Sequence, residues 1–133
     1  MRYTCTVIAV ADIKAARKFY EDLFGLEVFQ DYGRNIAFTC GLALQQDFDG
    51  FLRRLEEYPD MEYMGEVTEH SWGQRVIRFY DPDGHIIEVG EDMKMVIKRF
   101  LASGMTMEEI SVKMDASVED LMKLLDSECM VDE

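Results

Sequence analysis

Cysteine and long apolar runs are scarce in this sequence. The cysteines, Cys5, Cys40 and Cys129, are odd in number and form no C-x-x-C pair, so a disulfide framework is not expected. No apolar run approaches the length that spans a membrane, and the first residues follow a strand pattern rather than that of a signal peptide. We therefore expect a cytoplasmic protein without a membrane segment.

Basic residues are also scarce. The 133 residues include 14 lysines and arginines against 27 acidic residues, a formal net charge of −13. This balance argues against a surface built to neutralise the phosphates of nucleic acids or membranes. Small molecules and proteins are the expected partners. The length suits one domain, alone or with a small appendage.

Several catalytic motifs are absent. The sequence contains no G-x-G-x-x-G, no P-loop, no G-x-S-x-G and no H-E-x-x-H. Nothing in it therefore supports the chemistries that these motifs carry.

The most informative segment is Trp72–Val89. Residues 75–80 and 85–89 are rich in β-branched and aromatic residues, and Asp-Pro-Asp-Gly at 81–84 predicts the turn of a β-hairpin. With a four-residue turn, Ile77 would lie opposite Glu88, and Phe79 opposite Ile86. These side chains would share one face with Arg75. Val76, Ile87 and Val89 would then point the other way, towards a covering helix.

Other elements follow from local patterns. Tyr3–Val28 predicts a strand, an N-cap at Asp12, an amphipathic helix and a stop at Gly25. Strands are predicted at 26–30, 35–45 and 61–67, and a short helix after Asp47.

Two of these segments resemble a known superfamily. V-A-D-I, K-F-Y and L-F-G-L near the start, with D-P-D-G-H-I-I-E near residue 90, resemble the glyoxalase, bleomycin-resistance and extradiol-dioxygenase (vicinal oxygen chelate) superfamily. The resemblance implies an α+β fold of paired βαβββ modules that curl into a half-barrel around a ligand or metal. Ala43–Gln46 runs directly into Asp47, so the second module lacks a strand. Either one strand serves both modules, or a segment is absent.

Residues 91–133 form a second part. We assign 1–90 to the glyoxalase-like domain and 91–133 to an acidic helical tail. M-T-M-E-E-I followed by D-A-S-V-E-D-L resembles a helix-turn-helix. However, the tail holds 11 acidic and 5 basic side chains, and this excess of negative charge opposes binding to DNA. Packing or dimerisation is the expected role.

The resemblance also implies a metal centre. Metal-dependent members place a His on the first strand, a second ligand on the strand that opens the second module, and a Glu on the last strand. Such a set suits Zn²⁺, Ni²⁺ or Fe²⁺ as a Lewis acid. Glu88 matches the last position, Cys5 occupies the first, and the second has no carrier. Cys5 can be a soft ligand or plain core filling. We predict weak or absent metal.

The expected ligand pocket is mostly apolar. Trp72, Arg75, Ile77 and Phe79 would line it with Glu88, and His70 would stand at its mouth. Glu88 would be the catalytic base or a polar contact, or else a structural partner of Arg75. His70 can equally be a solvated loop residue, Trp72 a core residue, and His85 is expected to be structural.

Three functions remain open from the sequence. The first is binding of a small molecule, with metal-assisted lyase, isomerase or ring-cleaving activity. The second is metal-free binding or antibiotic sequestration, and the third is regulation through the tail. Because half-barrel modules leave sheet edges exposed, a homodimer is expected.

Overall fold

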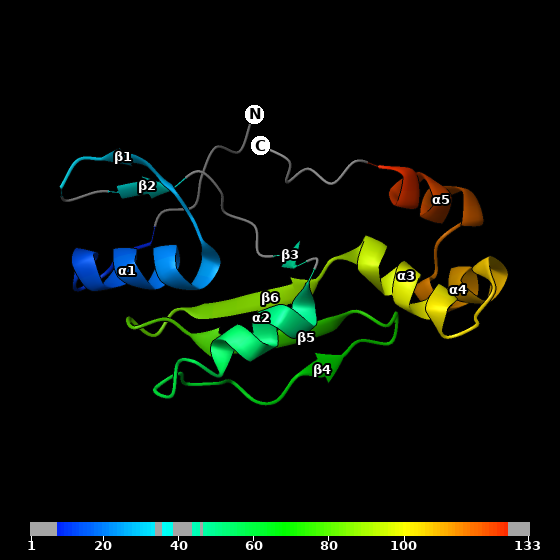
Figure 1. Cartoon of the computed structure of the whole chain (residues 1–133), viewed down its shortest axis with the longest axis horizontal. Coiled ribbons are helices and arrows are strands. Elements are labelled where there is room, and N and C mark those ends of the chain that lie inside the picture. Colours follow the sequence, from blue (N-terminus) through cyan, green and yellow to red (C-terminus); the bar gives the residue numbers. More distant parts are fainter. Residues whose placement is uncertain (1–7, 34–35, 39–43, 46, 128–133) are drawn as a thin grey trace.

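The elements form three groups along the molecule. The structure is a computed structural model that describes residues 8–33, 36–38, 44–45 and 47–127. Figure 1 shows α1, β1 and β2 at one end, a sheet with α2 in the middle, and α3 to α5 at the other end. The class is α+β, as predicted. No helix in the described part is long and apolar enough to cross a membrane.

The first group contains one helix and one strand pair. Helix α1 (Ile13–Phe24) begins where the Asp12 side chain accepts hydrogen bonds from two backbone N–H groups, and it ends at Gly25, whose φ is 65°. These are the predicted cap and stop. Strands β1 (Val28–Asp31) and β2 (Ile36–Phe38) pair antiparallel.

The central sheet has the strand order β3-β6-β5-β4. Its strands are β3 (Leu44–Gln45), β4 (Thr68–Glu69), β5 (Arg75–Tyr80) and β6 (Ile86–Glu91), and α2 (Phe48–Leu55) follows β3. β3 runs parallel to β6, and the other pairs are antiparallel. Since β3 pairs with the last strand and leads directly into α2, a short strand opens the second module. Among the described residues β3 pairs with β6 alone, so both alternatives for the missing strand stay open.

The predicted register of the β5–β6 hairpin is wrong by one residue. Arg78 lies opposite Glu88, and Tyr80 lies opposite Ile86, so the turn has five residues and includes His85. The cause is Asp81, whose side chain accepts hydrogen bonds from the N–H groups of Asp83 and His85. A shift of one position moves every following side chain to the other face of the sheet.

One face of the sheet carries the main core. Ile77, Phe79 and Val89 are buried there, together with four residues of α1 and α2, namely Leu23, Phe48, Phe51 and Leu55. The Phe24 ring of α1 stacks on Phe51 and Phe79, with centroids 5.8 and 6.3 Å apart. Ile87 and Val89 therefore face the same side as Ile77, contrary to the prediction, because of the register shift. On the opposite face Val76 is buried as well, at 2% exposure, whereas Arg78, Glu88 and Ile86 further along it are at least partly exposed.

The tail has its own apolar cluster. Its helices are α3 (Met93–Ala102), α4 (Met107–Met114) and α5 (Val118–Asp126). The buried residues of the cluster are Val96, Ile97, Phe100, Ile110 and Leu121. The predicted capping box of α4 is present, with Thr106 and Glu109 each bonded to the other's backbone N–H. The division into 1–90 and 91–133 stays a prediction, and β6 runs one residue past it.

Candidate functional site

Glu88 lies on the open face of the sheet, which α1 and α2 do not cover. Its partner is Arg78 on β5, with 2.6 Å between Glu88 Oε2 and Arg78 Nε. The Glu88 side chain is 49% exposed and that of Arg78 is 36% exposed. Arg75 points to the opposite face, because side chains alternate along a strand. The prediction that Glu88 and Arg75 share a face is therefore wrong.

Apolar side chains flank the Arg78–Glu88 pair. The Met64 N–H donates to the Arg78 carbonyl, and the Tyr80 N–H donates to Glu62, so residues 62–64 run along β5. The ladder places Met64, Tyr80 and Ile86 on the same face as the pair. Met64 is 50% exposed and Ile86 is 57% exposed. A guanidinium and a carboxylate between apolar groups can hold a small polar molecule, and the carboxylate can accept a proton.

Arg75 belongs to a second group of charges, around Glu91 at the end of β6. Glu91 Oε1 lies 3.0 Å from Arg75 Nη2, and Glu91 Oε2 lies 3.0 Å from Arg99 Nη2. Arg75 Nη1 also lies 2.8 Å from Asp49 Oδ1. Burial of Glu91 would raise its pKa, but the hydrogen bonds and charges of the two arginines outweigh burial and hold the pKa below its usual value. These bonds raise the pKa of Arg75.

This group of charges borders a cavity of about 330 Å³. The lining residues are Asp47, Phe48, Asp49, Arg75, Glu91, Met95, Lys98 and Arg99. We call it the seam cavity, because the sheet, α2 and α3 meet there. Sequence reasoning identified Arg75 but missed Glu91 and Arg99. The correct turn length would have placed Glu91 across from Arg75. Nothing in the sequence brings Arg99 to the same carboxylate.

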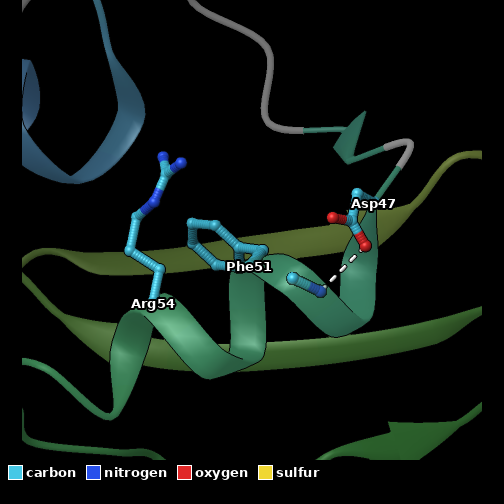
Figure 2. A pocket seen from close by; sticks show the side chains of 4 residues that line it. Asp47, Phe51 and Arg54 are labelled. Carbon is cyan, nitrogen blue, oxygen red and sulfur yellow. Dashed lines mark hydrogen bonds between the residues drawn. The ribbon is translucent and has the colours of Figure 1, made fainter.

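A smaller cavity of about 130 Å³ lies along α2 (Figure 2). The Gly50 N–H donates to Asp47 Oδ1 at 2.9 Å, and a Cβ on Gly50 would lie 2.0 Å from Asp47 Oδ2. Arg54 extends away from α2 and donates to the Leu23 carbonyl at 3.3 Å. This volume is well below the roughly 300–1,000 Å³ of ligand pockets, so the cavity is too small for a typical small-molecule ligand.

The other predicted ligand-binding residues divide into two sets. Ile77 and Phe79 are 4% and 0% exposed and pack in the core, where a ligand could reach them only by displacing a helix. His70 and Trp72 come together in the β4–β5 loop, with their rings stacked at 4.3 Å. The Trp72 Nε1–H donates to Gln74 Oε1 at 3.2 Å. Cys5, the other predicted metal ligand, lies outside the described residues.

Asp81, Asp83 and His85 form the one group in the described part whose donor atoms could surround a metal, all within 4.8 Å of one another. Asp81 Oδ2 already accepts from the Tyr20 hydroxyl at 2.7 Å and lies 2.7 Å from His85 Nδ1. Asp83 Oδ1 accepts from the Ala11 N–H at 2.7 Å. A metal would have to displace these donors. The group ties the hairpin turn to α1, and His85 takes part in it through its contact with Asp81.

Titration of the turn follows from the same contacts. Burial would raise the pKa of Asp81, but bonds from Tyr20, His85 and Asp83 hold it below its usual value. Burial and the bond to Asp81 raise the pKa of Tyr20. Both groups therefore keep their usual charge at neutral pH.

Among the described residues, Glu88 has an arginine rather than a metal ligand beside it, so these residues do not fit a metal centre at Glu88.

Comparisons with known proteins place this geometry in context. The family model described as a glyoxalase-like domain matches residues 3–53 and 45–94. The two matches overlap at 45–53, where β3 meets α2 and where the sequence predicted a missing strand. The comparison with curated proteins gave no match.

Solved structures with a similar fold come from bacteria. A protein of unknown function from Agrobacterium tumefaciens is 30% identical, with a TM-score of 0.60, over 68% of this chain and 94% of that one. A lactoylglutathione lyase from the same organism is 21% identical, with a TM-score of 0.56, over 66% and 91%. A glyoxalase/bleomycin resistance/dioxygenase superfamily member from Sphaerobacter thermophilus is 20% identical, with a TM-score of 0.54, over 68% and 98%. These likenesses confirm the predicted half-barrel fold.

Proposed function

Because the chain belongs to the glyoxalase-like family, we propose that it binds a small organic molecule on the open face of β4 to β6. The main support for this proposal is the Arg78–Glu88 pair. Glu88 Oε2 lies 2.6 Å from Arg78 Nε, and both side chains are partly exposed between Met64 and Ile86. Arg78 would hold an anionic or carbonyl oxygen of the ligand, and Glu88 would accept a hydrogen bond from it. Arg78 takes the role predicted for Arg75.

Within this proposal, binding without a metal is the main function. A divalent cation on Glu88 would lie beside the positive charge of Arg78 and would have to replace its hydrogen bond. The rival function is metal-assisted lyase, isomerase or dioxygenase activity, with Glu88 as ligand or base. A regulatory function through DNA is less favoured, because α5 exposes Glu119, Asp120 and Asp126 and carries one basic residue, Lys123.

We also propose a cytoplasmic homodimer. β4 is a two-residue edge strand, and Met64 and Val67 beside it are exposed. A second copy could cover this edge and close the open face over a ligand. The scarcity of cysteine supports a reducing compartment.

Elemental analysis and ligand screening of the purified full chain test this function. We expect less than one equivalent of metal in the native protein and in the Glu88→Gln and Cys5→Ala variants. A thermal-shift screen of small carboxylic and hydroxy acids should yield ligands that bind without added metal. Arg78→Gln and Glu88→Gln should each weaken binding about tenfold. Glu57→Gln, which alters an exposed carboxylate just after α2, is the matched control.

Two outcomes would contradict the proposal. A full equivalent of Zn²⁺, Ni²⁺ or Fe²⁺ that disappears in Glu88→Gln would establish the metal-dependent rival. Ligands whose affinity is unchanged in both Arg78→Gln and Glu88→Gln would show that the open face is not the site.

A further inference from the structure

Six of the eight residues that line the seam cavity are charged, and three of these, Asp47, Asp49 and Glu91, are acidic. Three of its lining residues, Arg75, Lys98 and Arg99, are basic, although the chain has only 14 basic residues against 27 acidic ones. The volume of about 330 Å³ is near the lower end of the range for small-molecule pockets, roughly 300–1,000 Å³. The cavity is therefore large enough for a small ligand.

Stability alone does not account for the charges in its wall. Glu91 is 3% exposed and is bonded by both Arg75 and Arg99. A buried ion group of this kind is often no more stable than apolar residues of the same size, since its desolvation offsets the attraction. One carboxylate between two guanidinium groups also leaves one positive charge uncompensated. Perturbed charges beside a cavity are typical of binding sites.

The uncompensated charge is met only by an exposed carboxylate. Asp49 Oδ1 lies 2.8 Å from Arg75 Nη1, yet the Asp49 side chain is 63% exposed, against 22% for Arg75. An exposed ion pair contributes little to stability, so Asp49 can be displaced at small cost. The position of Asp49 shows that a carboxylate fits against the outer edge of the Arg75 guanidinium, which donates hydrogen bonds to it.

Lys98 supplies a second cation. It is exposed on α3 at the cavity wall, and within the described part of the chain no acidic side chain pairs with it. Asp47, the third acidic lining residue, already caps α2 through the Gly50 N–H. An incoming anion would therefore meet two cations, Arg75 and Lys98, with Asp49 as the competitor on Arg75 and Asp47 as a nearby negative charge.

We propose that the seam cavity binds a small organic carboxylate. The ligand's carboxylate replaces Asp49 on Arg75 and pairs with Lys98. Its apolar part lies against Met95, because the Phe48 ring is only 2% exposed and lies 5.0 Å beneath the Arg75 guanidinium. Because Lys98 belongs to α3 and Arg75 to the sheet, the bound ligand links the tail to the rest of the molecule. This site is separate from the open face and does not depend on it.

An NMR titration of the full chain with benzoate tests the site. We expect saturable shifts of the Arg75 and Arg99 Nε–H signals and of the Asp49 and Lys98 amides. Lys98→Gln should weaken benzoate binding about tenfold, since it removes one charged contact. Asp49→Asn should tighten it several-fold, because the competitor loses its charge. Lys14→Gln, which removes an exposed lysine of α1, should leave affinity unchanged.

Other outcomes would overturn the proposal. Equal weakening in Lys98→Gln and Lys14→Gln would indicate general attraction to positive charge. Shifts centred on Arg78 would place benzoate on the open face instead. Tighter binding of inorganic phosphate than of benzoate at the same residues would contradict the assignment of an organic carboxylate.

Discussion

Glu91 shows what one buried carboxylate does in this molecule. It receives hydrogen bonds from Arg75 of the sheet and Arg99 of the tail, and its pKa lies below the usual value. A group with a lowered pKa in the folded state binds fewer protons there than when unfolded. Its stabilising effect is therefore complete above the unfolded pKa, about 4.3, and is lost as pH falls through the folded pKa.

We predict that Glu91→Gln removes part of this pH dependence. At neutral pH the variant should lose about 2 kcal/mol of unfolding free energy, because Arg99 keeps no negative partner there and Arg75 keeps only the exposed Asp49. Below about pH 4 the difference from wild type should shrink. Urea unfolding at several pH values measures this, with Glu57→Gln as control. Asp81 also has a lowered pKa, so some acid sensitivity should remain. Parallel pH profiles for wild type and Glu91→Gln would contradict the prediction.

At the scale of elements, α3 is attached to the β4–β5 loop through Gly73. The φ of Gly73 is 90°, and a Cβ there would lie 2.0 Å from Phe100 Cζ. The Arg99 Nη2 group donates to the Gly73 carbonyl at 2.5 Å. Both the backbone conformation and the close approach therefore require glycine at this position.

We predict that Gly73→Ala loosens α3. Gly84 has a similar φ of 81°, but a Cβ there would meet nothing within 4 Å, so Gly84→Ala measures the backbone cost alone, about 1 kcal/mol. Gly73→Ala should cost at least about 1 kcal/mol more, because the Phe100 ring must move. Thermal unfolding gives both values, and hydrogen exchange should rise in α3 only for Gly73→Ala. Equal losses in the two variants would contradict this account.

At the scale of the whole molecule, the tail and the sheet depend on each other. The tail has its own cluster around Phe100, and within the described part of the chain the side chain of Arg99 bonds it to Glu91 and to the Gly73 carbonyl. Removing residues after Gly90 would leave Arg75 with Asp49 alone and would uncover the Gly73 loop.

We predict that a chain ending at Gly90 melts at a lower temperature and is less soluble than the full chain. If the tail supports the proposed homodimer, the truncated chain should also lose the dimer mass. Differential scanning calorimetry and sedimentation velocity at micromolar concentration measure these properties. A chain ending at Ser127 keeps every described contact and is the control. An unchanged melting temperature and mass after truncation at Gly90 would contradict a structural role for the tail.

Local chemistry in the sequence was enough to predict much of the fold. Asp12, Gly25 and Thr106 begin or end helices through contacts with residues no more than four positions away. Such contacts depend on neighbours in the sequence, so they can be read without the tertiary structure. The two separated motifs likewise predicted the α+β half-barrel, and the final-strand position of Glu88.

The partners of the charged residues were decided only by the tertiary structure. Asp81 lengthens the hairpin turn while it bonds Tyr20, which lies 61 positions away, and Asp83 holds Ala11, 72 positions away. The longer turn places Glu88 and Arg75 on opposite faces of the sheet. Glu88 therefore pairs with Arg78, and Arg75 pairs with Glu91. Because side chains alternate along a strand, one extra residue in the turn moves every side chain of the following strand to the other face of the sheet. Arg99 reaches Glu91 only because α3 packs beside the sheet, a contact that local spacing does not specify.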